Sequence, residues 1–187
     1  MWRVPSKKKQ VFLTFDDGPV GIATDFVLQT LKEFKVPATF FCLGQQVEAY
    51  PSLTQRIIAE GHLLGNHGYH HLDGWKISKQ VYQDNLTKGN HAIRSVSGQD
   101  SLRFRAPYGH FRGRTSSVMW SLMSGDFDLQ LTKEKCLNRL ISLTRSGDII
   151  VFHDHEKSHE KLKWVLPKYL KYCIDQGFQF ELLPQEK

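Results

Sequence analysis

The sequence has 187 residues, 40% of them hydrophobic and 12% aromatic, which is enough for one sizeable core and excludes a disordered chain. No run approaches the roughly 18 consecutive apolar residues that cross a membrane, so we expect no transmembrane segment. The formal net charge is +6, but the basic residues are scattered and do not alternate with aromatic ones, which argues against a nucleic-acid partner.

Apolar runs alternate along the chain with segments of helical periodicity. The predicted strands cover residues 11–15, 38–43, 62–66, 102–106, 118–123, 149–153 and 178–183. The predicted helices cover residues 23–34, 47–60, 77–96, 137–143 and 162–174. This order predicts an α/β fold in one domain over residues 1–187, with a mostly parallel sheet, open or closed into a barrel, and helices outside it.

Polar side chains follow several of these strands at the point where each strand ends. They are Asp16 and Asp17, the segment 67–71, Arg105 and His153. Ligands bind beyond the carboxyl ends of parallel strands, so we expect these groups to share one site.

Asp16 and Asp17 directly follow the first predicted strand and precede Gly18-Pro19. Adjacent carboxylates on extended backbone point in different directions, so one can bind a metal while the other handles protons. The alternative is a solvated Asp-Asp-Gly turn.

His67 and His71 are four positions apart, a spacing that places two imidazoles on one face of a helical turn. With Asp17 they would form a two-histidine, one-carboxylate metal site with open positions for water and substrate. His70 competes with His71 as the second histidine, and the sequence leaves this alternative open.

Arg105 ends a strand, where a buried guanidinium needs a carboxylate, and Asp16 is the expected partner. His153 ends another strand and is placed to deliver a proton to a leaving group. Asp126 could orient that imidazole and keep it protonated. The alternatives are a surface arginine and a core histidine bonded to backbone.

Three cysteines, Cys42, Cys136 and Cys173, lack C-x-x-C spacing, and their odd number excludes complete pairing. No signal peptide is visible at the N-terminus. Two localisations stay open: the cytoplasm, or the cell envelope with an export or anchor segment ahead of the sequence given. The role of the positive charge is also left open by the sequence. The charge would either attract an anionic partner or belong to a lysine-rich solvated surface.

Five segments in this order resemble the polysaccharide deacetylase family, also called the NodB-homology domain or carbohydrate esterase family 4. The resemblance runs from Val11 to about Leu183. The matching segments are Thr14-Phe15-Asp16-Asp17-Gly18-Pro19, His67-Gly68-Tyr69-His70-His71, Arg105-Ala106-Pro107-Tyr108-Gly109, Ser124-Gly125-Asp126-Phe127 and Val151-Phe152-His153.

The resemblance implies a distorted (β/α)-barrel with fewer than eight complete units and a role for each matched residue. Asp17, His67 and His71 would bind one divalent ion, usually Zn²⁺, with Co²⁺, Ni²⁺ or Mn²⁺ as other options. The base would be Asp16, held by Arg105, and the acid would be His153, paired with Asp126. The backbone N–H of Tyr108 would help to stabilise the oxyanion.

The implied reaction is metal-dependent hydrolysis of acetyl groups on a glycan, most simply the N-acetyl groups of N-acetylglucosamine-type sugars in peptidoglycan or chitin-like polymers. The alternatives are an O-acetyl esterase of xylan type that uses the same residues, and a catalytically silent glycan-binding relative.

The sequence departs from the family pattern at Gly68, Met123, Phe127 and Val151 and in the segment after Gly109. Gly68 stands where the family usually has Ser or Thr, so a loop hydrogen bond is expected to be lost. Only residues 110–117 separate Gly109 from the strand expected at Val118, which is too short for a parallel crossover helix. We therefore expect one barrel helix to be missing there, with its face left uncovered and available for a wider groove or a dimer contact.

Overall fold

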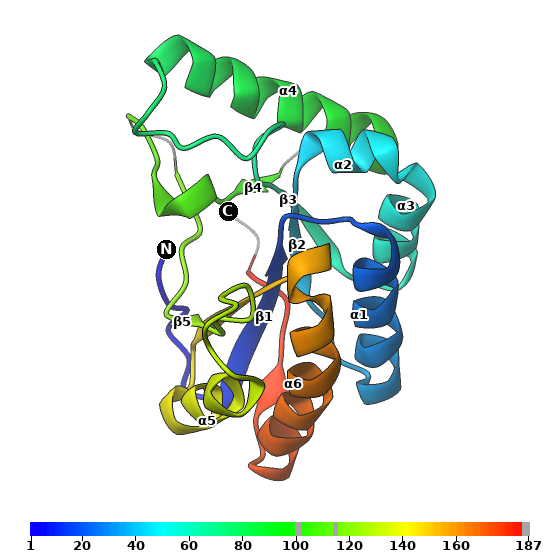
Figure 1. Ribbon diagram of the computed structural model, residues 1–187, viewed down its shortest axis with the longest axis vertical. Helices are drawn as coiled ribbons and strands as arrows, with labels where there is room; N and C mark the ends of the chain where they lie inside the picture. Colours follow the sequence, from blue (N-terminus) through cyan, green and yellow to red (C-terminus); the bar gives the residue numbers. More distant parts are fainter. Residues whose placement is uncertain (100–101, 114–115, 185–187) are drawn as a thin grey trace.

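The computed structural model describes residues 1–99, 102–113 and 116–184 and has a parallel sheet at its centre (Figure 1). Its strands are β1 (Gln10–Asp16), β2 (Thr39–Cys42), β3 (Leu63–Asn66), β4 (Arg103–Phe104), β5 (Leu122–Met123), β6 (Ile149–His153) and β7 (Gln179–Phe180). Its helices are α1 (Gly21–Phe34), α2 (Gly44–Ala49), α3 (Pro51–Ala59), α4 (Lys79–Ser97), α5 (Lys133–Leu143) and α6 (Glu156–Asp175), with a short 3₁₀ turn η1 (Pro107–Gly109).

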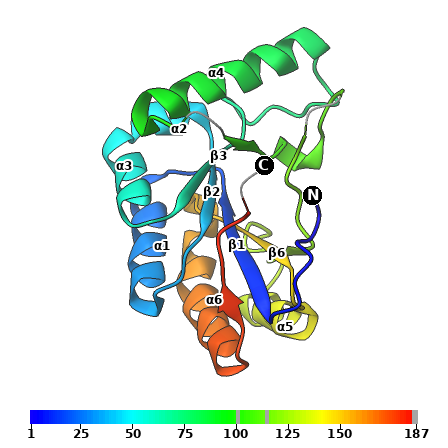
Figure 2. The ribbon, with the colours of Figure 1, turned by 180° about the vertical axis from the view of Figure 1, so that it is seen from behind.

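The strand order is β4-β3-β2-β1-β6-β5, with β7 paired to the start of β1, and every paired strand runs parallel. Within the described residues β4 and β5 do not pair, so the barrel stays open between them. This confirms an α/β barrel with fewer than eight units. The central strand β1 lies between β2 and β6, all three of which are labelled in Figure 2, and helices lie around the sheet (Figures 1 and 2).

Alternation along β1 assigns its side chains to two faces of the sheet. Val11, Leu13 and Phe15 are buried in the large core beneath the helices. Phe12 lies on the opposite face in a smaller core, and Asp16 shares that face by alternation. Packing under the helices therefore holds β1 in place. The face of the sheet that points away from the helices, which we call the inner face, carries Asp16 at the end of the strand.

The expected absence of a helix after Gly109 is confirmed for residues 110–113 and 116–117, the part of this segment that the structure describes. The expected uncovered outer face stays a prediction. Val118 is buried together with Leu183 and Phe12, and Val4 packs against the same cluster. The backbone N–H of Met119 also donates to the Met1 carbonyl at 2.7 Å. Residues near both ends of the chain thus pack against this segment on the face of the sheet that Phe12 occupies, and the dimer contact stays a prediction.

Several predicted elements differ in extent from the structure, among them the helix expected over 47–60 and the strand expected over 118–123. The helix expected over 47–60 is two helices, because the chain turns at Tyr50 and Pro51 begins α3 at the position where proline fits. The strand expected over 118–123 pairs only at Leu122–Met123, which align with Ile150 and Val151 of β6. Among the described residues, no helix is long and apolar enough to cross a membrane.

Candidate active site

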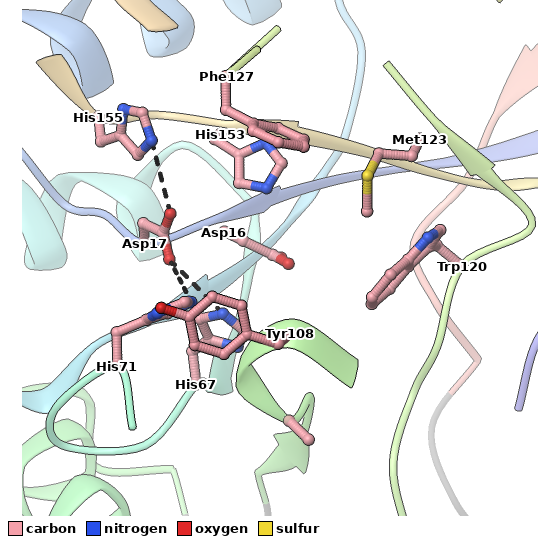
Figure 3. Close-up of a pocket in the computed structure, with 11 residues that line it drawn as sticks. Asp16, Asp17, His67, His71, Tyr108, Trp120, Met123, Phe127, His153 and His155 are labelled. Carbon is pink, nitrogen blue, oxygen red and sulfur yellow. Dashed lines mark ion pairs between the residues drawn. The ribbon is translucent and has the colours of Figure 1, made fainter. Parts of the chain in front are cut away.

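Asp16 and Asp17 lie at the carboxyl end of β1, in the middle of the polar cluster shown in Figure 3. Asp16 is the last strand residue and is buried. Asp17 has a φ of 80°, in the left-handed region, and the following Gly18–Pro19 peptide is cis. Because the backbone turns at Asp17, the two carboxylates point in different directions and can do different chemistry (Figure 3).

Asp17, His67 and His71 direct one ligand atom each toward a common point. The Oδ1 atom of Asp17 lies 3.5 Å from Nε2 of His67 and 3.4 Å from Nε2 of His71, and the three atoms lie within 4.8 Å of one another. That Oδ1 atom is buried without a hydrogen-bond partner among the described residues. A buried carboxylate oxygen with no donor is costly, and a divalent ion would satisfy it. The residues therefore fit a divalent ion of the kind that the resemblance implies.

The protonation of these side chains also suits a metal. The Nδ1–H of His67 donates to the Arg105 carbonyl at 2.8 Å, so Nε2 is the ring nitrogen that faces Asp17. Burial, assisted by the charge of His67, lowers the pKa of His71 and favours the neutral ring. Burial raises the pKa of Asp17, but the charges of the surrounding histidines, His67 first, outweigh it and lower that pKa below its usual value. Neutral imidazoles and an ionised carboxylate are the forms that bind metal.

The loop that carries the two histidines is not a helical turn, contrary to the expectation from the spacing. Residues 67–71 follow β3 as irregular backbone, with Gly68 at a φ of 87°. His71 faces Asp17, whereas His70 is exposed and its Nδ1 lies 2.7 Å from Gln45 Oε1. Of the two competing histidines, the structure brings His71 into the cluster.

Asn85 of α4 holds this loop, a contact that the sequence analysis missed. Its Oδ1 accepts from the His70 backbone N–H at 2.8 Å, and its Nδ2 donates to the His70 carbonyl at 2.9 Å. A Cβ atom at Gly68 would lie 2.6 Å from Asn85 Nδ2. The glycine therefore makes room for an amide that supplies loop hydrogen bonds, so the departure at Gly68 does not leave the loop unsupported.

Arg105 is fully buried and forms the expected ion pair with Asp16. Its Nη1 donates to Asp16 Oδ1 at 2.7 Å and to Thr14 Oγ1 at 2.8 Å. Its Nε donates to the Val118 carbonyl at 3.0 Å, and its guanidinium lies 4.1 Å from the centre of the Phe41 ring. Arg105 thus orients Asp16 and also bridges the opening between β4 and β5.

His153 and Asp126 form the second expected pair. The Nδ1 of His153 lies 2.8 Å from Asp126 Oδ1, and the His153 backbone N–H donates to Asp126 Oδ2 at 2.7 Å. Burial opposes a charge on the ring, but Asp126, with smaller contributions from Asp16 and Asp17, outweighs it and raises the pKa of His153 to about 9. The imidazole is therefore cationic near neutral pH, with Nδ1 occupied and Nε2 free to donate.

The ligand cluster, Asp16 and His153 line one cavity of about 180 Å³, and Arg105 and Asp126 hold Asp16 and His153 from behind its lining. Its apolar wall is formed by Ala106, Trp120, Met123 and Phe127. In Figure 3, Asp16 and Asp17 lie between His67 and His71 on one side and His153 and His155 on the other. A second cavity of about 530 Å³ adjoins it and shares Asp17, His71, Tyr108 and His155.

Two further residues of the site gave no clear signal in the sequence. His155 lines both cavities, with Nε2 3.7 Å from Asp17 Oδ2, and its Nδ1 accepts from the Ser158 N–H at the start of α6. Asp154 is buried and accepts from the Gly18 N–H at 3.1 Å and the Thr24 hydroxyl at 2.6 Å. Burial raises its pKa to about 8. Asp154 and His155 come directly after His153 in the sequence. Their contacts with Gly18 and Asp17, in the turn after β1, are visible only in the folded structure.

A family model for polysaccharide deacetylases matches residues 3–122. The chain is 30% identical to a peptidoglycan-N-acetylglucosamine deacetylase of Bacillus cereus, over 96% of this chain and 88% of that protein. It is 32% identical to a chitooligosaccharide deacetylase of Rhizobium leguminosarum bv. trifolii, over 96% of this chain and 93% of that protein.

A solved structure of a peptidoglycan N-acetylglucosamine deacetylase superimposes with a TM-score of 0.92 at 28% identity, covering 98% of this chain and 90% of that one. The sequence match and the shared fold agree with the site geometry. The chain belongs to the polysaccharide deacetylase family, and it is therefore a hydrolase that removes acetyl groups from glycans.

Proposed function

We propose that this chain removes N-acetyl groups from N-acetylglucosamine-type sugars in peptidoglycan or chitin-like polymers, with one Zn²⁺ ion held by Asp17, His67 and His71. The observation that carries this proposal is the placement of the ligand cluster, the Asp16–Arg105 pair and the His153–Asp126 pair around one small cavity. Two imidazoles and a carboxylate are a donor set that zinc accepts in catalytic sites with open positions.

The bound ion would lower the pKa of a water molecule and polarise the acetyl carbonyl. Asp16 is the base of the proposed reaction. Its Oδ1 is held by Arg105, and its carboxylate lines the cavity, where it can take the proton of the attacking water. The hydrogen bond from Arg105 keeps the carboxylate oriented between turnovers.

Tyr108 is the proposed donor to the oxyanion that develops on the acetyl carbonyl. It lines both cavities, and its φ of 58° turns the backbone at the wall of the site. Among the described residues, its N–H has no acceptor within the protein. An unpaired backbone donor beside the reacting group is the arrangement that stabilises such a charge.

His153 is the acid, and its protonation favours N-acetyl over O-acetyl substrates. An amine leaves only after its nitrogen is protonated, whereas an alkoxide depends less on such a proton. A cationic His153, supported by Asp126, supplies that proton at neutral pH. The apolar wall of Ala106, Trp120, Met123 and Phe127 offers a place for the acetyl methyl group.

The test is release of acetate from chitooligosaccharides, peptidoglycan fragments and acetylated xylan under identical conditions. We expect turnover of the first two and little from xylan. Faster release from xylan would assign the chain as an O-acetyl esterase. Binding of all three without acetate release would assign it as a silent glycan-binding relative and contradict the proposal.

Asp126→Asn is expected to move the basic limb of the rate–pH profile to lower pH. The active His153 is protonated, so activity is present below its pKa and lost as the pH rises through it. Asp126 is the principal group that raises this pKa to about 9, and a neutral amide removes that charge. The measurement is kcat/KM from pH 5 to 10. Asp128→Asn, an exposed aspartate two positions away, is the matched control. An unchanged basic limb in Asp126→Asn would remove Asp126 from its role.

A further inference from the structure

A row of aromatic rings leads from His71, one of the three candidate metal ligands, to the exposed Trp75 on the loop before α4. The ring centroids of His71 and Tyr108 are 4.5 Å apart, and those of Tyr108 and His110 are 6.0 Å apart. The indole of Trp75 stacks on His110, with centroids 3.7 Å apart and planes 4° from parallel. We call Tyr108, His110 and Trp75 the aromatic rim. It is continuous with the active-site cavity through Tyr108, which lines that cavity.

The outer end of the rim is exposed although it is apolar. Trp75 is 65% exposed and Tyr108 is 59% exposed. The stacking covers one face of the indole with His110 and leaves the other face to the solvent. Large apolar surface of this kind beside a binding site commonly marks a ligand contact.

The indole is also held in place. The backbone N–H of Trp75 donates to Asp73 Oδ1 at 3.0 Å, and the same oxygen lies 2.7 Å from Nδ1 of His110, the ring on which the indole stacks. Arg112 donates to the carbonyls of Gly74 and Trp75. A Cβ atom at Gly74 would overlap the His110 carbonyl oxygen, so this close approach of the two segments requires glycine. The loop around Trp75 thus docks on the short segment after Gly109 and presents a fixed flat surface.

We infer that Trp75 is a glycan-stacking subsite that binds a sugar ring of the polymer away from the ring being deacetylated. The C–H face of a pyranose is apolar and flat, and it packs on an aromatic ring, whereas its hydroxyl groups stay in water at the edges. A pre-ordered indole loses little side-chain entropy on binding. This inference rests on the proposed glycan substrate and adds to it a preference for chains longer than the reacting sugar.

The test compares Trp75→Ala with wild type on N-acetylglucosamine dimers and pentamers. The pentamer should lose roughly three- to tenfold in kcat/KM, mostly through KM, because one aromatic stacking contact is removed. The dimer, too short to reach Trp75 at the outer end of the rim, should be unaffected. Trp2→Ala is the matched control, since Trp2 is 61% exposed and lies outside the rim. Trp75→Phe, which keeps a flat ring, should restore much of the loss.

A second arm measures pentamer binding by calorimetry in an Asp16→Asn background, with and without Trp75→Ala, and so needs no turnover. If Trp75→Ala weakens pentamer binding by the same factor, the subsite is supported even when no substrate is deacetylated. A lack of deacetylation would overturn only the proposed function. Equal losses for dimer and pentamer, or no loss for either, would show a merely structural tryptophan and overturn the inference. Absence of any pentamer binding would also overturn it.

Discussion

Asp16→Asn is expected to lower kcat by about 10²- to 10⁴-fold while the protein still binds its metal ion. Asp16 accepts from Arg105 and lines the cavity, but it does not belong to the ligand cluster of Asp17, His67 and His71. An amide keeps the shape of the side chain and can still accept from Arg105, but it cannot take a proton from water. The measurement is acetate release together with metal content by elemental analysis.

Stability must be followed in the same experiment, because Arg105 is fully buried and Asp16 is its carboxylate partner. Removing the negative charge leaves a buried cation less well compensated, so we expect a lower melting temperature. Assays should therefore run well below the new transition. Asp175→Asn, an exposed change at the end of α6, is the matched control and should leave rate and stability unchanged. Retained turnover in folded Asp16→Asn would assign the base to another group.

His71→Ala is expected to lower metal affinity by more than about 100-fold and to lower activity with it. Loss of a residue that hydrogen-bonds to a metal ligand lowers metal affinity by about 10- to 100-fold, and loss of the ligand itself should lower it more. Wild type should carry about one divalent ion per chain, since Asp17, His67 and His71 form one cluster. The measurement is competition with a chelator of known affinity, followed by acetate release at saturating metal.

His70→Ala is the matched control for this prediction. It removes an imidazole one position away that is exposed and faces Gln45, so metal and activity should both be retained. The Asn85 contacts are to the His70 backbone and survive the substitution. If His70→Ala lost the metal and His71→Ala kept it, the assignment of the two histidines would be reversed.

The parallel sheet and the central polar pairs could be predicted because they depend on local pattern. The run from Val11 to Phe15 is buried on both faces and predicts a central strand, and the polar residue after it must lie at the strand's carboxyl end. The pairs Asp16–Arg105 and Asp126–His153 follow from the need of buried charges for partners.

Contacts that depend on how loops fold over one another could not be predicted in this way. Asn85 holds the histidine loop from a helix, and Trp75 stacks on His110 from a segment 35 positions away in the sequence. The burial of Val118 depends on both ends of the chain, which carry no periodic signal. In each case the partner is chosen by tertiary packing, so neither periodicity nor spacing indicates it.

The most direct test of metal-dependent glycan deacetylation is acetate release from a chitooligosaccharide as Zn²⁺ is titrated into chelator-stripped protein. The account predicts that stripped protein is inactive and that the rate rises in proportion to bound metal until about one ion per chain is reached. Full activity in the stripped protein, or no acetate at any metal loading, would contradict it.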